Sequence, residues 1–135
     1  MTKILLVGDS KFLRLATEFA LARAGYEVST ATDGENALQI AREKRPDVIL
    51  LDMLLPKMTG PDVLKALKSD PATSGIAVVA FTGPSHKNAS RLEHDGACAF
   101  LDKAELGLEK GSEVVVALAH IIPSLKLDVP AGAAK

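Results

Sequence analysis

The stretch VILLDMLLPKMTG, residues 48 to 60, places one carboxylate, that of Asp52, among aliphatic and thioether side chains before it ends in a proline and a glycine. Burying an ionised carboxylate without a partner costs several kcal/mol or more. The sequence therefore predicts that Asp52 stands at the end of a buried strand, where other groups compensate its charge.

Segments of strand length alternate with helical segments along the whole chain. The expected strands are residues 3–7, 26–31, 47–51, 76–81 and 98–101. Three of them are nearly continuous aliphatic runs, which is typical of strands buried on both faces of a parallel sheet, whereas 26–31 alternates and is expected at an edge. Strands that alternate with helices form right-handed crossovers, so we expect an α/β fold with a doubly wound parallel sheet.

Proline, glycine and aspartate mark the ends of five expected helices. Gly25 follows the first helix, and the second lies between Asp33-Gly34 and Pro46. The third begins at Pro61-Asp62, and the fourth lies between Pro84-Ser85 and Gly96. The fifth runs from about Ser112 to Pro123. Residues 126–135 are expected to form a flexible tail, so that one domain covers residues 1–125.

Composition favours an ordinary globular domain and excludes several classes of function. Apolar residues make up 47% of the 135 residues, and the formal net charge is -1, which gives nucleic acid no electrostatic attraction. The single Cys98 cannot form an internal disulfide, and the three histidines lack zinc-binding spacing. Because the first residues have neither a signal peptide's pattern nor a membrane span's length, we expect a cytoplasmic protein with no membrane partner.

Polar residues follow the expected strands at the edge of the sheet where such folds place their sites. Asp9 follows the first strand, Asp52 the third, Thr82 the fourth and Lys103 the fifth. Two carboxylates on adjacent strands repel each other unless a hard cation lies between them, and Mg²⁺ accepts one or two carboxylates together with phosphate oxygens. A strand-end aspartate can also be a simple helix cap, but four such residues at four strand ends favour a common site.

This arrangement, with the motif LLDMLLPKMTG, resembles the receiver domain of bacterial two-component response regulators over about residues 3–122. The resemblance implies a flavodoxin-like fold with strand order 2-1-3-4-5. It implies that Asp52 accepts a phosphoryl group from a phosphohistidine of a sensor histidine kinase or histidine phosphotransferase, and that Lys103 neutralises the transferring group. It also implies Mg²⁺ as cofactor, bound by Asp9, Asp52 and the backbone carbonyl of Leu54.

The same resemblance implies a switch that carries the signal to a downstream protein target. The hydroxyl of Thr82 is expected to move toward the phosphoryl group and vacate space into which Phe100 rotates. The face formed by the fourth helix, fifth strand and fifth helix would then be the readout surface. A permanently buried Phe100 is the alternative.

Because no DNA-binding or enzymatic segment follows residue 122, we expect a stand-alone, chemotaxis-type protein that is not an enzyme and acts as a monomer or transient dimer.

Three departures from the family pattern modify these expectations. Gly8 stands where the family usually has the first of two acids, so we expect weakened Mg²⁺ binding with phosphorylation retained. Ala104 replaces the usual proline after Lys103, so we expect a trans peptide bond and a changed loop. Leu54 and Pro84 cannot orient water through their side chains, so we expect slow autodephosphorylation.

The first helix carries more apolar surface than one sheet face requires. Helical spacing groups Leu13, Ala16 and Ala20 on one face, and Phe12, Leu15 and Phe19 extend that face sideways. In the family this helix docks against the helix bundle of the phosphodonor, so Phe12, Leu15 and Phe19 are candidate partner contacts. Packing in the domain's own core is the alternative.

Three other functions are possible for this fold. A pseudo-receiver that binds partners without phosphorylation is motivated by Gly8 and Ala104. A metal-dependent phosphatase needs a second aspartate two residues after the nucleophile, where this chain has Leu54, so we disfavour it. A flavin-binding protein needs a phosphate-binding loop rich in Ser, Thr and Gly after the first strand, which is missing here.

Overall fold

A computed structural model describes residues 2–8, 11–52, 60–82, 99–102 and 118 of the chain. Of residues 11–13, 60, 81–82 and 99–102 it describes the course of the backbone. The elements are β1 (Lys3–Val7), α1 (Lys11–Arg23), β2 (Glu27–Ala31), α2 (Gly34–Lys44), β3 (Val48–Asp52), α3 (Gly60–Ser69), β4 (Ala77–Thr82) and β5 (Ala99–Asp102).

The five strands form one parallel sheet with the order β2-β1-β3-β4-β5. This order confirms the flavodoxin-like fold and the edge position of β2. Asp52 and Thr82 were expected to follow their strands, but each is the last residue of its strand, because the parallel ladder continues one residue further than the apolar runs. The expected fourth and fifth helices and the tail lie outside the described residues, except Leu118, which is helical and fully buried.

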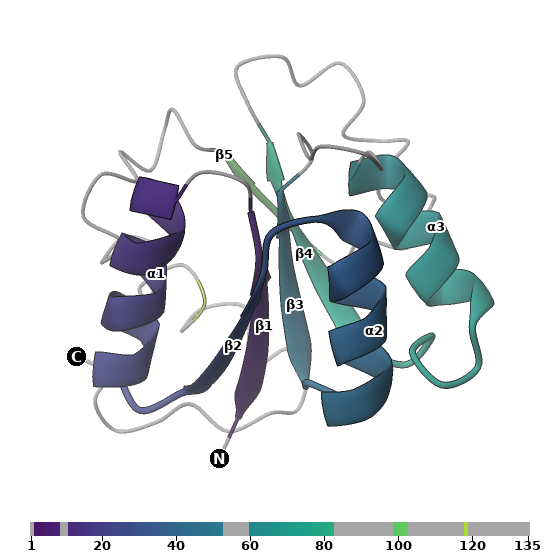
Figure 1. The fold of residues 1–135 in the computed structure, drawn as a ribbon, viewed down its shortest axis with the longest axis horizontal. Coiled ribbons are helices and arrows are strands. Elements are labelled where there is room, and N and C mark those ends of the chain that lie inside the picture. The colour runs from purple at the N-terminus through teal and green to yellow at the C-terminus, as the bar shows by residue number, and fades with distance from the viewer. Residues whose placement is uncertain (1, 9–10, 53–59, 83–98, 103–117, 119–135) are drawn as a thin grey trace.

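The sheet is covered on both sides, with α1 on one side and α2 and α3 on the other (Figure 1). The β3 strand is buried along its whole length, as its near-continuous aliphatic sequence predicts. The core beneath α2 and α3 includes Leu5, Val7, Ile49, Leu51, Val63, Leu64, Leu67, Val78 and Ala80. This packing fixes the central strands, and therefore fixes where their carboxyl ends stand.

The end of α1 is closed by a Schellman motif. The N–H of Gly25 donates to the carbonyl of Ala22 at 3.1 Å, and the N–H of Tyr26 donates to that of Leu21 at 3.1 Å. Gly25 has a φ of 108°, which an L side chain adopts only with strain. Gly25, which the sequence analysis places after this helix, is therefore required by the left-handed backbone conformation at that position.

The buried face of α1 differs from the expected one. Ala16 and Ala20 are only half-buried, whereas Thr17, Leu21 and Ala24 are buried. The helix is thus rotated about its axis relative to the expected face. The predicted face was wrong because Thr17 is polar. Its hydroxyl interrupts the apolar pattern, so the row of residues that faces the core was not recognised in the sequence.

The ends of α2 match the sequence signals. The carboxylate of Asp33 accepts a hydrogen bond from the N–H of Asn36 at 2.8 Å and so caps the first turn. Arg45 closes the helix with a φ of 45°, in the left-handed region that favours glycine, and Pro46 follows. An exposed arginine therefore occupies a strained position at this end.

The segment between α3 and β4 is fixed by side-chain hydrogen bonds. The hydroxyl of Thr73 donates to the carbonyl of Leu67 at 2.7 Å, and the ammonium of Lys68 donates to that of Ile76 at 2.7 Å. Asp70 accepts from the N–H of Ala72 at 2.9 Å and pairs with the guanidinium of Arg42 on α2 at 2.8 Å. The hydrogen bond from Arg42, followed by that from Ala72, lowers the pKa of Asp70.

Candidate functional site

The carboxyl ends of the central strands lie side by side at one edge of the sheet. Val7 pairs with Leu51, so the next residues, Gly8 and Asp52, stand at the same level. Asp52 pairs with Phe81 of β4, and Thr82 pairs with Asp102 of β5. The fold therefore brings the backbone positions of Asp52 and Thr82 together, as the sequence predicted, and Lys103 follows Asp102 directly in the chain.

Asp52 is buried at the end of the central strand. Its side chain retains 7% of its exposed surface, while the four residues that precede it in β3 are 0% exposed. A carboxylate at a largely buried residue needs hydrogen-bond donors, cations or both as partners. This burial is the expected setting for a group that holds a cation and a phosphoryl group.

Gly8 is the neighbour of Asp52 on β1. Its N–H donates to the carbonyl of Ala31 on β2 at 3.1 Å, and its carbonyl accepts a hydrogen bond from Nη1 of Arg14 at 3.1 Å. Among the described residues, a Cβ added to Gly8 would meet nothing within 4 Å, and the φ of Gly8 lies outside the left-handed region. The backbone at Gly8 is thus held by hydrogen bonds, and the position beside Asp52 has space for a side chain.

Sequence reasoning missed the contact of Arg14. Arg14 lies near the start of α1 and its guanidinium reaches back to the end of β1 in a partly buried contact. No signal in the sequence separates an arginine that reaches back in this way from one that points into water, because both occupy the same helical position.

The described donor atoms fit a hard cation such as Mg²⁺. The carboxylate of Asp52 is an oxygen ligand, and the open space at Gly8 leaves room next to it. Within the described ranges no group of three His, Cys, Asp or Glu residues could hold a metal ion. Mg²⁺ needs only one or two carboxylates because it retains several waters, so this donor set is compatible with it.

Several residues expected at the site lie outside the described part of the chain. These are Asp9, Leu54 and Lys103, together with Ala104 and Pro84. The side chains of Thr82, Phe100 and Phe12 are likewise outside it, although the backbone of each is described. Their assigned roles remain predictions.

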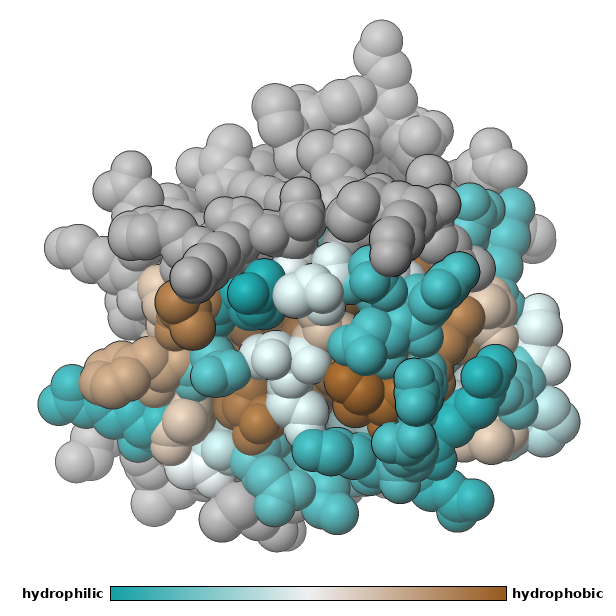
Figure 2. Space-filling model, viewed as in Figure 1, coloured by the Kyte–Doolittle hydropathy of each residue, from teal (hydrophilic) through white to brown (hydrophobic). Residues whose placement is uncertain are grey.

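Two apolar side chains of α1 are exposed. Leu15 retains 51% and Phe19 67% of the exposed surface, so packing in the domain's own core, the alternative for these residues, is wrong. They are four residues apart and therefore share one helix face, which we call the α1 patch. Figure 2 shows apolar side chains at the surface on the left of the view, where Figure 1 places α1.

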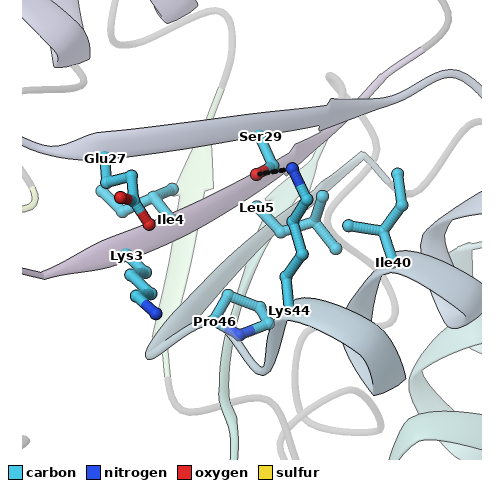
Figure 3. A pocket seen from close by; sticks show the side chains of 8 residues that line it. All are labelled: Lys3, Ile4, Leu5, Glu27, Ser29, Ile40, Lys44 and Pro46. Atoms are coloured by element: carbon cyan, nitrogen blue, oxygen red, sulfur yellow. Dashed lines mark hydrogen bonds between the residues drawn. The ribbon is translucent and has the colours of Figure 1, made fainter.

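A small pocket lies at the opposite end of the strands from Asp52 (Figure 3). It is formed where the first residues of β1 and β2 meet the last turns of α2, and it is lined by Lys3, Ile4, Leu5, Glu27, Ser29, Ile40, Lys44 and Pro46. The ammonium of Lys44 donates to the hydroxyl of Ser29 at 3.4 Å across it. None of the residues expected at the site takes part in this pocket, so it is separate from the strand ends.

In the part of the chain that the structure covers, no helix has both the length and the apolar character needed to cross a membrane.

Comparison with known proteins places the chain in one family. The model of the response regulator receiver domain matches residues 4–110. The response regulator PleD of Caulobacter vibrioides is 41% identical over 103 residues, which are 75% of this chain and 22% of that protein. The gliding motility regulatory protein of Myxococcus xanthus is 40% identical over 109 residues, which are 79% of this chain and 14% of that protein.

Solved structures show the same similarity. The chemotaxis response regulator CheY4 of Vibrio cholerae superposes with a TM-score of 0.78 at 29% identity, over 90% of this chain and 98% of that one. A response regulator receiver domain protein from Clostridium thermocellum gives a TM-score of 0.73 at 29% identity, over 90% and 97% of the two chains.

The chain spans only 14% to 51% of the first three curated relatives that it matches, so the similarity concerns the receiver domain of each. The family model covers more than half of the chain, and the strand order agrees with the fold expected of a receiver domain. The chain therefore belongs to the response regulator receiver domain family.

Proposed function

We propose that this chain is a response regulator switched by phosphorylation, in which Asp52 accepts a phosphoryl group from a phosphohistidine. The donor is a sensor histidine kinase or a histidine phosphotransferase. The observation that carries this proposal is the burial of Asp52, 7% exposed, at the carboxyl end of the central strand of a receiver domain. The domain covers residues 1–125, acts in the cytoplasm as a monomer or transient dimer, and signals without an enzyme activity of its own.

The proposed chemistry is a direct displacement at phosphorus. A carboxylate oxygen of Asp52 forms the new O–P bond while the P–N bond to histidine breaks, and the imidazole nitrogen keeps the electron pair and takes a proton. Asp9, Asp52 and the carbonyl of Leu54 would hold Mg²⁺, which would supply positive charge beside the transferring group. Lys103 stabilises the same charge, and the hydroxyl of Thr82 donates a hydrogen bond to a phosphoryl oxygen.

The proposed signal passes from Thr82 to β5. Thr82 pairs with Asp102, and Ala80 pairs with Phe100, so β4 and β5 are joined by backbone hydrogen bonds close to the phosphorylated residue. A shift of Thr82 toward the phosphoryl group would reach Phe100 through this ladder. The face formed by the expected fourth helix, β5 and the expected fifth helix would then bind the downstream protein target.

Mass spectrometry after incubation with acetyl phosphate and Mg²⁺ tests the proposal. Wild-type protein should gain one phosphoryl group, and Asp52→Asn should gain none. Asp62→Asn, which changes an exposed aspartate on α3, is the matched control and should still be phosphorylated. Equal phosphorylation of the wild type and Asp52→Asn would disprove the assignment of Asp52.

The alternative is a pseudo-receiver that binds partners without phosphorylation. It is favoured by Gly8, since the first of the usual two acids is replaced by a residue with no side chain. Beryllofluoride with Mg²⁺, which mimics the phosphoryl group, distinguishes the two functions. Changes in the NMR spectrum around Asp52 support phosphorylation, and an unchanged spectrum supports the pseudo-receiver.

A further inference from the structure

We propose that Arg14 is a positioning residue of the phosphorylation site, because its guanidinium holds the carbonyl of Gly8 and so fixes the backbone from which Asp9 follows. This inference rests on the proposed function of Asp9 and Asp52. It adds a residue of α1 that would set the affinity for Mg²⁺ without touching the ion.

The first step of the argument is the freedom of Gly8. Glycine has the largest conformational freedom of any residue, and here a Cβ would meet no atom of the described part of the chain within 4 Å. Side-chain packing therefore cannot hold this position. What holds it are two hydrogen bonds, one from its N–H to the carbonyl of Ala31 and one from Arg14 to its carbonyl, both at 3.1 Å.

The second step is location. Gly8 stands level with Asp52, and the next residue in the chain is Asp9, the proposed second carboxylate ligand. The peptide group between Gly8 and Asp9 includes the carbonyl that Arg14 binds, so the guanidinium restrains the unit that leads into the ligand. Groups that orient a metal ligand in this way typically change metal affinity by about 10-fold or more when removed.

The third step is the strength of the restraint. The contact is partly buried and its donor is charged, and such hydrogen bonds are about twice as strong as neutral ones. The two hydrogen bonds of Gly8 act on opposite sides of the residue, one on its N–H and one on its carbonyl. Loss of the Arg14 side chain would therefore release the carbonyl of Gly8, which leads to Asp9, while the hydrogen bond from the N–H of Gly8 to Ala31 remains.

Variants of the full-length chain test the proposal, with Mg²⁺ affinity measured by calorimetric titration. Arg14→Met removes the hydrogen bond and should raise the Mg²⁺ dissociation constant about tenfold. Arg14→Lys keeps a charged donor and should recover most of the affinity. Arg23→Met, at an exposed position in the last turn of α1, is the matched control and should leave affinity unchanged. These three variants and the wild type should have melting temperatures that agree closely.

A double variant separates positioning from a simple effect of charge. Gly8→Ala restricts the backbone, and its Cβ enters open space. If Arg14 acts by restraining Gly8, adding Gly8→Ala to Arg14→Met should restore a good part of the lost affinity. The proposal is overturned if Arg14→Met costs as much affinity in the Gly8→Ala protein as in the wild type, or if Arg14→Met leaves affinity unchanged.

A measurement without metal distinguishes failure of this inference from failure of the proposed function. Arg14→Met should speed amide hydrogen exchange of Asp9, whose N–H belongs to the peptide group that Arg14 holds, in the metal-free protein, whereas Arg23→Met should not. If the wild type binds no Mg²⁺ and is not phosphorylated, the proposed function fails, and the role of Arg14 is then decided by this exchange rate alone. Unchanged exchange at Asp9 overturns it.

Discussion

Gly8 is the residue at which this chain departs most directly from the family pattern. It stands level with Asp52, at the place where the resemblance leads us to expect the first of two acids, and a Cβ built there meets none of the described atoms within 4 Å. Its φ is outside the left-handed region, so an L residue fits the backbone. The position is therefore open to substitution, and the effect of the missing acid can be measured directly.

Gly8→Asp should raise the affinity for Mg²⁺ about tenfold, because the added carboxylate can orient water bound to the ion. Gly8→Ala is the control, since it adds a Cβ and changes the backbone freedom without a carboxylate. Calorimetric titration of the three proteins measures the effect. An affinity of Gly8→Asp that equals that of Gly8→Ala would contradict the prediction.

Arg45 is a second residue at which the backbone decides the outcome. Its φ of 45° is strained for an L side chain, and its own side chain is exposed. Arg45→Gly should raise the free energy of unfolding by about 0.5–1 kcal/mol. Lys44→Gly, one residue earlier within α2, should lower it by about 1 kcal/mol. Urea denaturation of both variants tests the sign at each position.

Among the helices and strands, α1 has one face that packs in the core and one apolar face that is exposed. Thr17, Leu21 and Ala24 are buried, whereas the α1 patch of Leu15 and Phe19 is exposed. Exposed apolar side chains that share one helix face suit a partner helix, and the proposed phosphodonor would supply one. The patch stands on the same helix as Arg14.

Substitution of Leu15 and Phe19 by serine should slow phosphotransfer from a histidine phosphotransferase about tenfold or more, because hot-spot residues of an interface contribute about 1 kcal/mol or more each. Phosphorylation by acetyl phosphate, which needs no docking, should keep its rate. The melting temperature should change little, while Leu21→Ala in the core should lose about 3 kcal/mol of stability. Equal slowing with both donors would rule out docking at the patch.

The salt bridge between Arg42 and Asp70 joins α2 to the segment that follows α3. The pKa of Asp70 is lowered from 3.8 in the folded chain, so the group adds stability above that pH and loses it as pH falls through the folded value. Asp70→Asn should therefore lower the melting temperature at neutral pH, and the difference from wild type should vanish in strong acid. A difference in melting temperature that persists in strong acid would show that the substitution acts through lost packing and not through the lost charge.

In the whole molecule, the α2 and α3 side of the sheet is expected to stay fixed when the switch operates. It rests on a cluster of fully buried residues from three strands, which opens only at a high free-energy cost. Beryllofluoride with Mg²⁺ should slow hydrogen exchange at the ends of β3 and β4 and in β5, and leave α2 and α3 unchanged. Exchange that slows equally on both sides of the sheet would contradict a switch confined to β4 and β5.

The sheet, its strand order and the place of Asp52 could be predicted from the sequence. Continuous apolar runs distinguish strands buried on both faces from the alternating edge strand, and this distinction is local in the chain. The caps at Asp33 and Gly25 are also local signals, since each satisfies groups within a few residues. The candidate site came from the resemblance to the receiver domain, whose family model matches residues 4–110, and the roles of the site residues stay predictions.

The sequence by itself determined which segments become strands and helices, because their periodicity and end signals are properties of neighbouring residues. The tertiary structure alone decided which face of α1 is buried and which residues reach across the fold. Leu15 and Thr17 could each have faced the core, and the rotation of the helix against the sheet put Thr17 there. The contacts of Arg14 with Gly8 and of Arg42 with Asp70 also depend on the tertiary structure. A long side chain can reach its hydrogen-bond partner only when packing has fixed the relative positions of the two backbone segments.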